Sequence, residues 1–175
     1  MGQAKDWSLR LARMEDAEAM PGIEARAGRM FAEIEGLAEV AGGETVSLER
    51  LRRYIRKGHC LVAHEEGRII GFVVTEPFGR ELHIWEMSVD PDHQRRGIGA
   101  GLLRAVMIDA RNSGFKALTL TTFRDVPWNA PFYERLGFEE VTALDAHPRL
   151  AGELALEADH GLPADRRCAM IRFLD

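Results

Sequence analysis

A glycine-rich turn, Gln94-Arg95-Arg96-Gly97-Ile98-Gly99-Ala100, has the residue types and the spacing that suit phosphate binding. It lies between a predicted strand and a predicted helix. The first amides of a helix have no carbonyl within the helix to donate to, and the helix dipole adds partial positive charge there. Glycine lets an anion approach this backbone closely. The turn therefore predicts a phosphate site, with a plain tight turn before a helix as the alternative.

Two common nucleotide-binding loops fit this turn poorly. A Walker A loop needs Gly-Lys followed by Ser or Thr, whereas Ala100-Gly101 stands at the corresponding place here. A dinucleotide loop needs three spaced glycines in an early β-α-β unit. Arg95 occupies the first of those glycine positions, and the preceding strand comes in mid-chain after a hairpin. Both types of nucleotide site are disfavoured.

The turn resembles the pyrophosphate loop of the GNAT superfamily, the CoA-dependent N-acyltransferases. In that family Gln or Arg is followed by two residues, Gly, one residue, and Gly or Ala. The preceding segment Met87-Ser88-Val89-Asp90-Pro91 is similar to the strand end and turn of the family. The later segment Pro131-Phe132-Tyr133-Glu134-Arg135-Leu136-Gly137-Phe138 resembles its helix with a Phe-Tyr pair before Leu-Gly-Phe. The resemblance implies one GNAT domain over residues 1–175.

The resemblance also implies a binding site for acetyl-CoA as cosubstrate. The backbone of Met87 and Val89 would pair with the pantetheine arm, and the amides from Arg95 to Ala100 would hold the pyrophosphate. Either arginine of the loop is a phosphate contact or an ordinary exposed side chain. The expected cofactor-binding residues are Met87, Val89, Gln94, Arg95, Arg96, Gly97, Ile98, Gly99, Ala100 and Asn129.

The chain departs from the family pattern just before its second motif. Many members carry asparagine seven residues before the tyrosine, but Val126 stands there and Asn129 lies four residues before Tyr133. Asn129 is expected either to contact the cofactor or to cap the following helix with its side chain. This difference weakens an assignment to the ribosomal-protein N-terminal acetyltransferases.

The position of Tyr133 resembles that of the general acid of the family. A thiol of pKa about 8.5 leaves as thiolate, and a nearby phenol can return its proton. The alternative is an ordinary aromatic side chain that packs on the sheet. The oxyanion would be stabilised by a strand amide, which we assign to Met87.

The general base is expected on the strand formed by residues 81–89. An ammonium of pKa about 10.4 must lose a proton before attack. Strict alternation places His83 on the same face as Trp85 and Met87, and Glu86 on the other face. His83 is favoured, since its ordinary pKa of about 6.5 suits a base at neutral pH. A bulge would instead bring Glu86 to the active face, and deprotonation through water is a third alternative.

Periodicity indicates the elements that position these residues. Short β-rich runs at residues 60–64 and 69–75, with a glycine-containing turn between them, predict a hairpin. Apolar residues at helical spacing predict a helix that follows Gly97 and ends at Gly114, and Ser47 is expected to cap an earlier helix. Asp16 is expected to cap a helix that Pro21-Gly22 interrupts. Further strands are predicted at residues 7–11, 117–122, 137–141 and 168–173, and further helices at 23–40, 129–136 and 148–158.

The order of the elements predicts an α/β (mixed α+β) fold. With the resemblance, it implies a mostly antiparallel, twisted sheet that is splayed at its central strands and has helices on both faces. The net charge of −5 and the lack of a basic face argue against nucleic acid as partner. No apolar run is long enough to span a membrane. The first ten residues lack an apolar signal core, and the two cysteines are far apart, so a cytoplasmic protein is expected.

The expected function is acetyl transfer from acetyl-CoA to a primary amine of a small molecule, by direct attack in a ternary complex. The alternatives are a non-catalytic acyl-CoA-binding module and a protein N-terminal or lysine acetyltransferase. No metal is implied, and a homodimer is left open. Acidic residues of the variable regions are candidates to attract a cationic acceptor, although such side chains are usually just solvated. They are Glu24, Glu33, Glu35, Glu153, Glu157 and Asp159.

Overall fold

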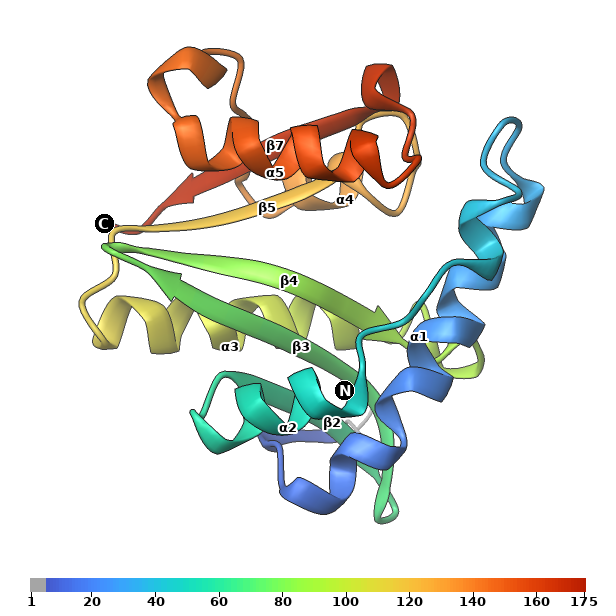
Figure 1. Ribbon diagram of the computed structural model, residues 1–175. Helices are drawn as coiled ribbons and strands as arrows, with labels where there is room; N and C mark the ends of the chain where they lie inside the picture. Colours follow the sequence, from blue (N-terminus) through green and yellow to red (C-terminus); the bar gives the residue numbers. More distant parts are fainter. Residues whose placement is uncertain (1–5) are drawn as a thin grey trace. The chain divides into compact units, whose positions relative to one another are not determined.

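The computed structural model describes residues 6–175 and shows a mixed α/β fold (Figure 1). Its described strands form a seven-stranded sheet in the order β1-β2-β3-β4-β5-β7-β6. The pairs β1–β2, β2–β3, β5–β7 and β6–β7 are antiparallel, and the pair β4–β5 is parallel. The expected fold class, with its mostly antiparallel sheet, is confirmed. The strands are β1 (Ser8–Leu11), β2 (Cys60–Glu65), β3 (Arg68–Phe78), β4 (Glu81–Val89), β5 (Ala117–Phe123), β6 (Glu139–Glu140) and β7 (Arg167–Phe173).

The α-helices are interspersed with the strands along the chain. They are α1 (Met20–Gly28), α2 (Leu48–Arg56), α3 (Ile98–Asn112), α4 (Ala130–Arg135) and α5 (Pro148–Asp159). The chain divides into two compact units. The first unit consists of Met1–Glu76 and Ile84–Ile108, and the second of Pro77–His83 and Asp109–Asp175. Strand β4 therefore contributes residues to both units.

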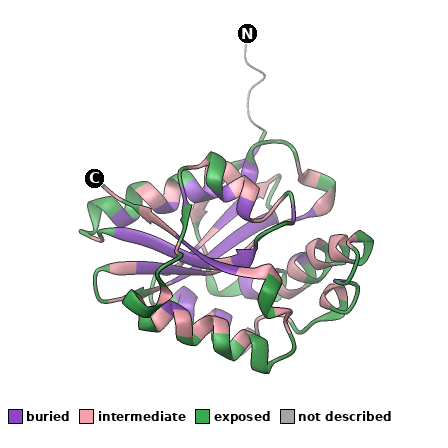
Figure 2. Cartoon of the chain, turned by 90° about the horizontal axis from the view of Figure 1, so that it is seen from above, coloured by how far each residue is buried: buried purple, intermediate pink, exposed green. Residues whose placement is uncertain are grey.

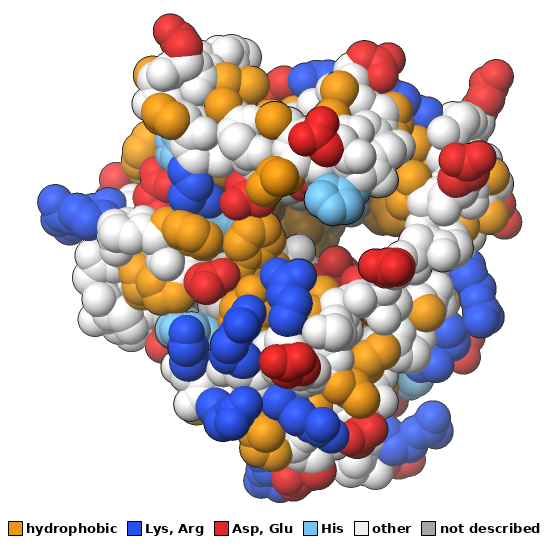
Figure 3. All heavy atoms as spheres, viewed as in Figure 1, with side chains coloured by type: hydrophobic (Ala, Val, Ile, Leu, Met, Phe, Trp, Pro, Cys, Tyr) orange, Lys and Arg blue, Asp and Glu red, His pale blue; other side chains and the backbone are white. Residues whose placement is uncertain are grey.

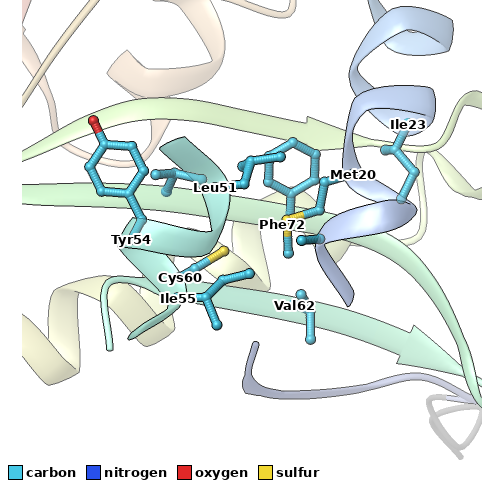
Figure 4. Packing of buried hydrophobic residues seen from close by; sticks show 10 residues of the cluster. Met20, Ile23, Leu51, Tyr54, Ile55, Cys60, Val62 and Phe72 are labelled. Atoms are coloured by element: carbon cyan, nitrogen blue, oxygen red, sulfur yellow. The ribbon is translucent and has the colours of Figure 1, made fainter. Parts of the chain in front are cut away.

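In the first unit, α1 and α2 cover one face of the strands and α3 covers the other (Figure 1). The side chains of β3 alternate accordingly. Phe72 and Val74 belong to the hydrophobic cluster that α1 and α2 complete. Gly71, between Phe72 and Ile70, faces α3, and a Cβ placed on it would lie 3.4 Å from the Ile98 side chain. Figure 4 shows this cluster, in which the Tyr54 hydroxyl points away from the other labelled side chains.

Helix α2 begins as the sequence predicts. The Ser47 side chain accepts a hydrogen bond from the Arg50 amide at 3.3 Å, and Gly58, with φ of +73°, follows the end of the helix. The predicted cap at Asp16 is wrong. A 3-10 helix, Met14–Glu18, covers that position, and the Asp16 carboxylate accepts from the Arg13 amide and the Arg10 guanidinium.

Helix α1 is not interrupted by proline, contrary to the expectation. Pro21 stands in its first turn, where a missing N–H costs no helical hydrogen bond. Helix α3 packs closely on the residue that precedes β1. A Cβ at Gly101 would lie 2.7 Å from the Trp7 ring, so glycine is needed at this position.

In the second unit, α5 lies on one face of β5 and β7, and α4 lies on the other (Figure 1). Thr119 and Thr121 of β5 point toward α5, where they contact Arg149 and Glu157. The strands of both units are mainly buried, whereas the helices carry exposed residues (Figure 2). Among residues 6–175, no helix is both long and apolar enough to cross a membrane.

Candidate functional site

The predicted phosphate turn has a backbone that is shaped to bind an anion. Arg95 and Gly97 both have positive φ, 61° and 78°, and helix α3 begins at Ile98. The first backbone hydrogen bond of this helix runs from the Gly101 amide to the Gly97 carbonyl at 2.9 Å. The amides just before Gly101 therefore have no carbonyl of the helix to donate to. Backbone that alternates into the left-handed region before a helix N-terminus forms a concave anion site.

The side chains of this turn have partners within the first unit. The Gln94 amide donates to the Val89 carbonyl at 3.3 Å, and so holds the turn against the end of β4. Arg96 forms an ion pair with Glu65, with its Nη1 atom 3.2 Å from Oε2. Arg95 is exposed. Of the two arginines of the turn, Arg96 is thus held by a carboxylate of the first unit.

A pair of carboxyl groups lies between α1 and β4. The Glu24 carboxylate accepts a hydrogen bond from the Val46 amide at 2.9 Å, and the Glu86 carboxylate accepts one from the Ser88 hydroxyl at 2.7 Å. Burial of Glu24, reinforced by the negative charge of Glu86, raises the pKa of Glu24 to about 8. Glu24 is therefore mainly protonated at pH 7. Its carboxyl group gains or loses its proton as the pH passes through about 8.

Beside this carboxyl pair, a second polar group fixes two aromatic side chains. The Glu76 carboxylate accepts from the Trp85 indole at 2.7 Å and from the Tyr54 hydroxyl at 3.3 Å. Trp85 also packs against the core cluster under α1 and α2. Glu86, the next residue of β4, acts on Glu24 of α1 through its negative charge.

His83 is enclosed in the second unit. It is only 1% exposed, and its Nδ1 atom lies 2.8 Å from the Thr119 hydroxyl and 3.3 Å from Arg149 Nη1. Because a guanidinium can only donate, Nδ1 acts as an acceptor here. Burial, followed by the positive charges of Arg149 and His147, lowers the pKa of His83 to about 3. The expectation of a base that titrates near pH 6.5 is therefore wrong, and His83 is poorly suited to take a proton from an ammonium.

Helix α4 of the second unit carries Tyr133, and Asn129 immediately precedes the first residue of this helix. Tyr133 is 8% exposed, and its ring packs edge-on against Phe132 and Phe138 at centroid distances of 5.3 and 5.6 Å. The Asn129 side chain makes no capping hydrogen bond, so the capping alternative is wrong. Its Oδ1 atom is buried and has no hydrogen-bond partner among residues 6–175. A buried acceptor of this kind usually receives its hydrogen bond from an ordered water or a ligand.

Each unit thus contains only some of the predicted site residues. The phosphate turn, Met87, Val89 and Glu86 belong to the first unit, and His83, Asn129 and Tyr133 to the second. The sequence did not indicate that Glu24 is affected by the charge of Glu86, or that Glu76 binds the Trp85 indole. Glu24 stood out only as one acidic residue among several. In the described part of the chain, no group of His, Cys, Asp and Glu side chains is arranged to hold a metal ion.

Comparisons with known proteins agree on one family. The family model of the acetyltransferase (GNAT) domain matches residues 56–140. The chain is similar to S-(2-succino)cysteine N-acetyltransferase of Bacillus subtilis (strain 168), at 31% identity over 140 residues, which cover 74% of the chain and 82% of the relative. It is also similar to ribosomal protein bS18-alanine N-acetyltransferase of Escherichia coli (strain K12), at 31% identity over 78 residues. That match covers 45% of the chain and 53% of the relative, so the chain spans about half of that protein.

Solved structures show the same fold. The PaiA N-acetyltransferase from Thermoplasma acidophilum, in complex with coenzyme A, superposes with a TM-score of 0.71 at 16% identity and covers 95% of this chain and 98% of its own. The ribosomal-protein-S18-alanine N-acetyltransferase from Escherichia coli superposes with a TM-score of 0.68 at 18% identity, and covers 97% of this chain and 94% of its own.

Proposed function

Because the chain belongs to the GNAT acetyltransferases and is an acyltransferase, we propose that it transfers an acetyl group from acetyl-CoA to a primary amine of a small molecule. The observation that carries this proposal is the backbone of the phosphate turn. Arg95 and Gly97 have positive φ angles just before the start of α3. An anion such as the pyrophosphate of acetyl-CoA fits that arrangement.

The remaining cosubstrate contacts are assigned residue by residue. The amides from Arg95 to Ala100 hold the pyrophosphate, with Gln94 bracing the turn, and the backbone of Met87 and Val89 pairs with the pantetheine arm. The buried, unpartnered Oδ1 atom of Asn129 supports a contact with a donor of the cosubstrate. The Arg96 side chain contributes only if it leaves Glu65.

The chemistry requires a base, an oxyanion donor and an acid. We assign the base to the Glu24–Glu86 pair, since a carboxyl with a pKa of about 8 can accept the proton that the ammonium loses. The Met87 amide donates to the acetyl oxygen as it gains negative charge. The amine nitrogen bonds to the acetyl carbon, the carbon–sulfur bond breaks, and Tyr133 returns a proton to the thiolate.

Direct attack of the amine is favoured over a cysteine-bound acetyl intermediate. The only two cysteines of the sequence, Cys60 and Cys168, are buried. Burial raises the pKa of the Cys60 thiol to about 12 and that of Cys168 to about 11. Neither thiol is therefore ionised enough near neutral pH to act as a nucleophile. Their buried, unpaired state also supports a reducing compartment such as the cytoplasm.

A small-molecule acceptor is preferred to a protein acceptor. The match to the relative named for S-(2-succino)cysteine extends over 74% of this chain, whereas the match to the ribosomal-protein enzyme extends over 45%. We retain one catalytic domain over the whole chain as part of the proposal.

The proposal is tested by two measurements on the full chain. Acetyl-CoA should raise the melting temperature, because a ligand that binds only the folded state stabilises it. Gly99→Val should abolish most of that rise, since its side chain enters the space that the pyrophosphate needs. Gly152→Val, on exposed helix α5 with nothing within 4 Å of its Cβ, is the control for a β-branched residue in a helix.

The second measurement is release of free CoA thiol with acetyl-CoA and a panel of amines that includes S-(2-succino)cysteine, amino acids, polyamines and an alanine-initiated peptide. Release with a small amine supports the proposal. Release with the peptide alone assigns a protein acceptor, and acetyl-CoA binding without release for any acceptor identifies a non-catalytic acyl-CoA-binding module.

A further inference from the structure

The Arg50 side chain of α2 lies against two aromatic rings of the first unit. Its guanidinium carbon is 5.8 Å from the centroid of the Tyr54 ring and 6.0 Å from that of Trp85. Its Nη2 atom also donates to the Tyr54 hydroxyl at 3.1 Å. These contacts restrict where the guanidinium can lie, because a cation is attracted to the face of an aromatic ring.

The two rings are themselves held in place. Glu76 accepts hydrogen bonds from both the Trp85 indole and the Tyr54 hydroxyl, and Tyr54 is only 2% exposed. An arginine placed on a rigid support loses little side-chain freedom when it binds a ligand. Arg50 is therefore preorganised, although its own position on α2 is exposed.

Among residues 6–175, Arg50 has no carboxylate bound to it, in contrast to Arg26 and Arg52 of the same unit. Arg26 pairs with Asp90, and Arg52 pairs with Glu18. Within residues 6–175, Arg50 forms no ion pair. Its charge nevertheless acts on Glu24, whose pKa it lowers against the larger effects of burial and Glu86. The Arg50 guanidinium is thus a neighbour of the carboxyl pair, with donor groups left for a ligand.

The surface around Arg50 has the opposite charge to the protein as a whole. The net charge of the chain is −5, yet lysine and arginine side chains gather over α2 (Figure 3). These residues are Arg50, Arg52, Arg53 and Arg56 of α2 and Lys57, which follows the last residue of the helix. A local positive field raises the encounter rate of an anionic ligand and repels a polycation.

Resting on the proposed function, we propose that the acceptor is an anionic amino acid whose carboxylate binds the Arg50 guanidinium while its amino group faces Glu24 and Glu86. The planar fork of arginine matches a carboxylate through two parallel hydrogen bonds. The carboxyl pair attracts the ammonium end. Charges of both signs, in neighbouring positions of one unit, suit a molecule that carries both groups.

The experiment compares each amino-acid acceptor with its own methyl ester, which keeps the amine and removes the negative charge of one carboxylate. Initial rates of CoA release are measured for glutamate, S-carboxymethylcysteine and alanine, each paired with its α-methyl ester, and for putrescine. Values of kcat/KM are expressed per unprotonated amine, because esterification lowers the pKa of the amine. The variants are Arg50→Gln, Arg50→Lys and, as a charge-matched control on exposed α3, Arg104→Gln.

The wild type should prefer the acid to its ester by about tenfold or more, the size of a charged hydrogen-bonded contact. Arg50→Gln should bring that ratio close to one, mainly through KM for the acid, and Arg104→Gln should leave it unchanged. Arg50→Lys should retain part of the preference, which keeps the test valid if Arg50→Gln is poorly folded.

Equal rates for acids and esters in the wild type would overturn the assignment of Arg50 while leaving acetyl transfer intact. The same holds if the preference persists in Arg50→Gln, or if putrescine is the best acceptor. Absence of CoA release with every amine would instead count against the proposed function itself.

Discussion

Glu24 on α1 and Glu86 on β4 form a carboxyl pair, in which burial of Glu24 and the charge of Glu86 raise the pKa of Glu24 to about 8. Two acidic side chains that come from separate segments thus hold a proton at neutral pH. In the proposed mechanism, Glu24 becomes a proton acceptor as pH rises through about 8 and its carboxyl group ionises.

The rate of the reaction should depend on the ionisation of Glu24. With one good acceptor, kcat/KM of the wild type should rise with pH through about 8, as Glu24 loses its proton. Glu24→Gln should lower the rate and remove this contribution to the profile, leaving only that of the amine itself. Glu86→Gln should shift the rise to lower pH, because a neighbouring negative charge is removed. A profile that is unchanged in both variants would show that the pair is not the base.

The same carboxyl group should make folding stability fall as pH rises. Glu24 keeps its proton in the folded state up to about pH 8, whereas the unfolded chain loses it near 4.5, so the folded state binds more protons between these values. The stabilisation is complete below about pH 4.5 and is lost as pH approaches 8. Glu24→Gln should be less sensitive to pH over this window in denaturant unfolding. An identical pH dependence of the two proteins would argue against the raised pKa.

His83 should affect acid stability rather than the pH dependence of catalysis. Its folded pKa of about 3 lies below the ordinary 6.5, so only the unfolded chain gains a proton as pH falls below 6.5. The free energy of unfolding should decrease by about 2 kcal/mol from this residue between pH 6.5 and 5, at about 1.4 kcal/mol per unit. His83→Gln should lack that decrease and should keep the shape of the rate profile. Loss of a rate limb near pH 6.5 in the variant would restore His83 as a base.

Tyr133→Phe should lower kcat by about 100-fold or more, within the range of general acid–base catalysis. The ring contacts with Phe132 and Phe138 do not need the hydroxyl, so acetyl-CoA affinity and melting temperature should change little. Steady-state kinetics and calorimetric titration with acetyl-CoA separate the two effects. A variant with full kcat would reduce Tyr133 to a packing residue.

Asn129→Ala should act in opposite directions on the free protein and on the complex. In the free protein it removes a buried acceptor without a partner among the described residues, so stability should stay constant or increase. The additional stabilisation by acetyl-CoA should decrease, because the proposed contact is lost. Melting curves with and without acetyl-CoA measure both. A variant that is destabilised alone, and stabilised normally by acetyl-CoA, would indicate a purely structural role.

Local sequence patterns were sufficient for most of the elements and for the glycine-containing turn before α3. The expected strand at residues 81–89 has the same bounds as β4, and Ser47 caps α2 as predicted. Such features depend on neighbours in the chain, so the sequence carries their signal directly. Asp16 and Pro21 were misjudged because Asp16 binds Arg10 of β1 and because proline is well tolerated in the first helical turn.

The chemistry of the site depended instead on contacts between distant segments. Periodicity cannot show that Glu24 meets Glu86, or that Arg50 lies on the ring of Trp85. His83 was misjudged for the same reason, since Arg149 of α5, far along the chain, donates to its ring. Ionisation is set by such neighbours and by burial, neither of which a strand pattern reveals.

The ion pair between Arg96 and Glu65 means that the phosphate turn already has an anion of its own. Glu65 ends the strand before the β2–β3 turn and binds the arginine that would otherwise be available to a phosphate. In the proposed site, the carboxylate therefore competes with the phosphate for the Arg96 guanidinium alone and lowers that contribution to binding. Glu65→Gln should strengthen acetyl-CoA binding, most clearly at low salt, where charges are least screened. In the free protein, the guanidinium closest to the proposed phosphate site is thus held by a carboxylate of the same chain.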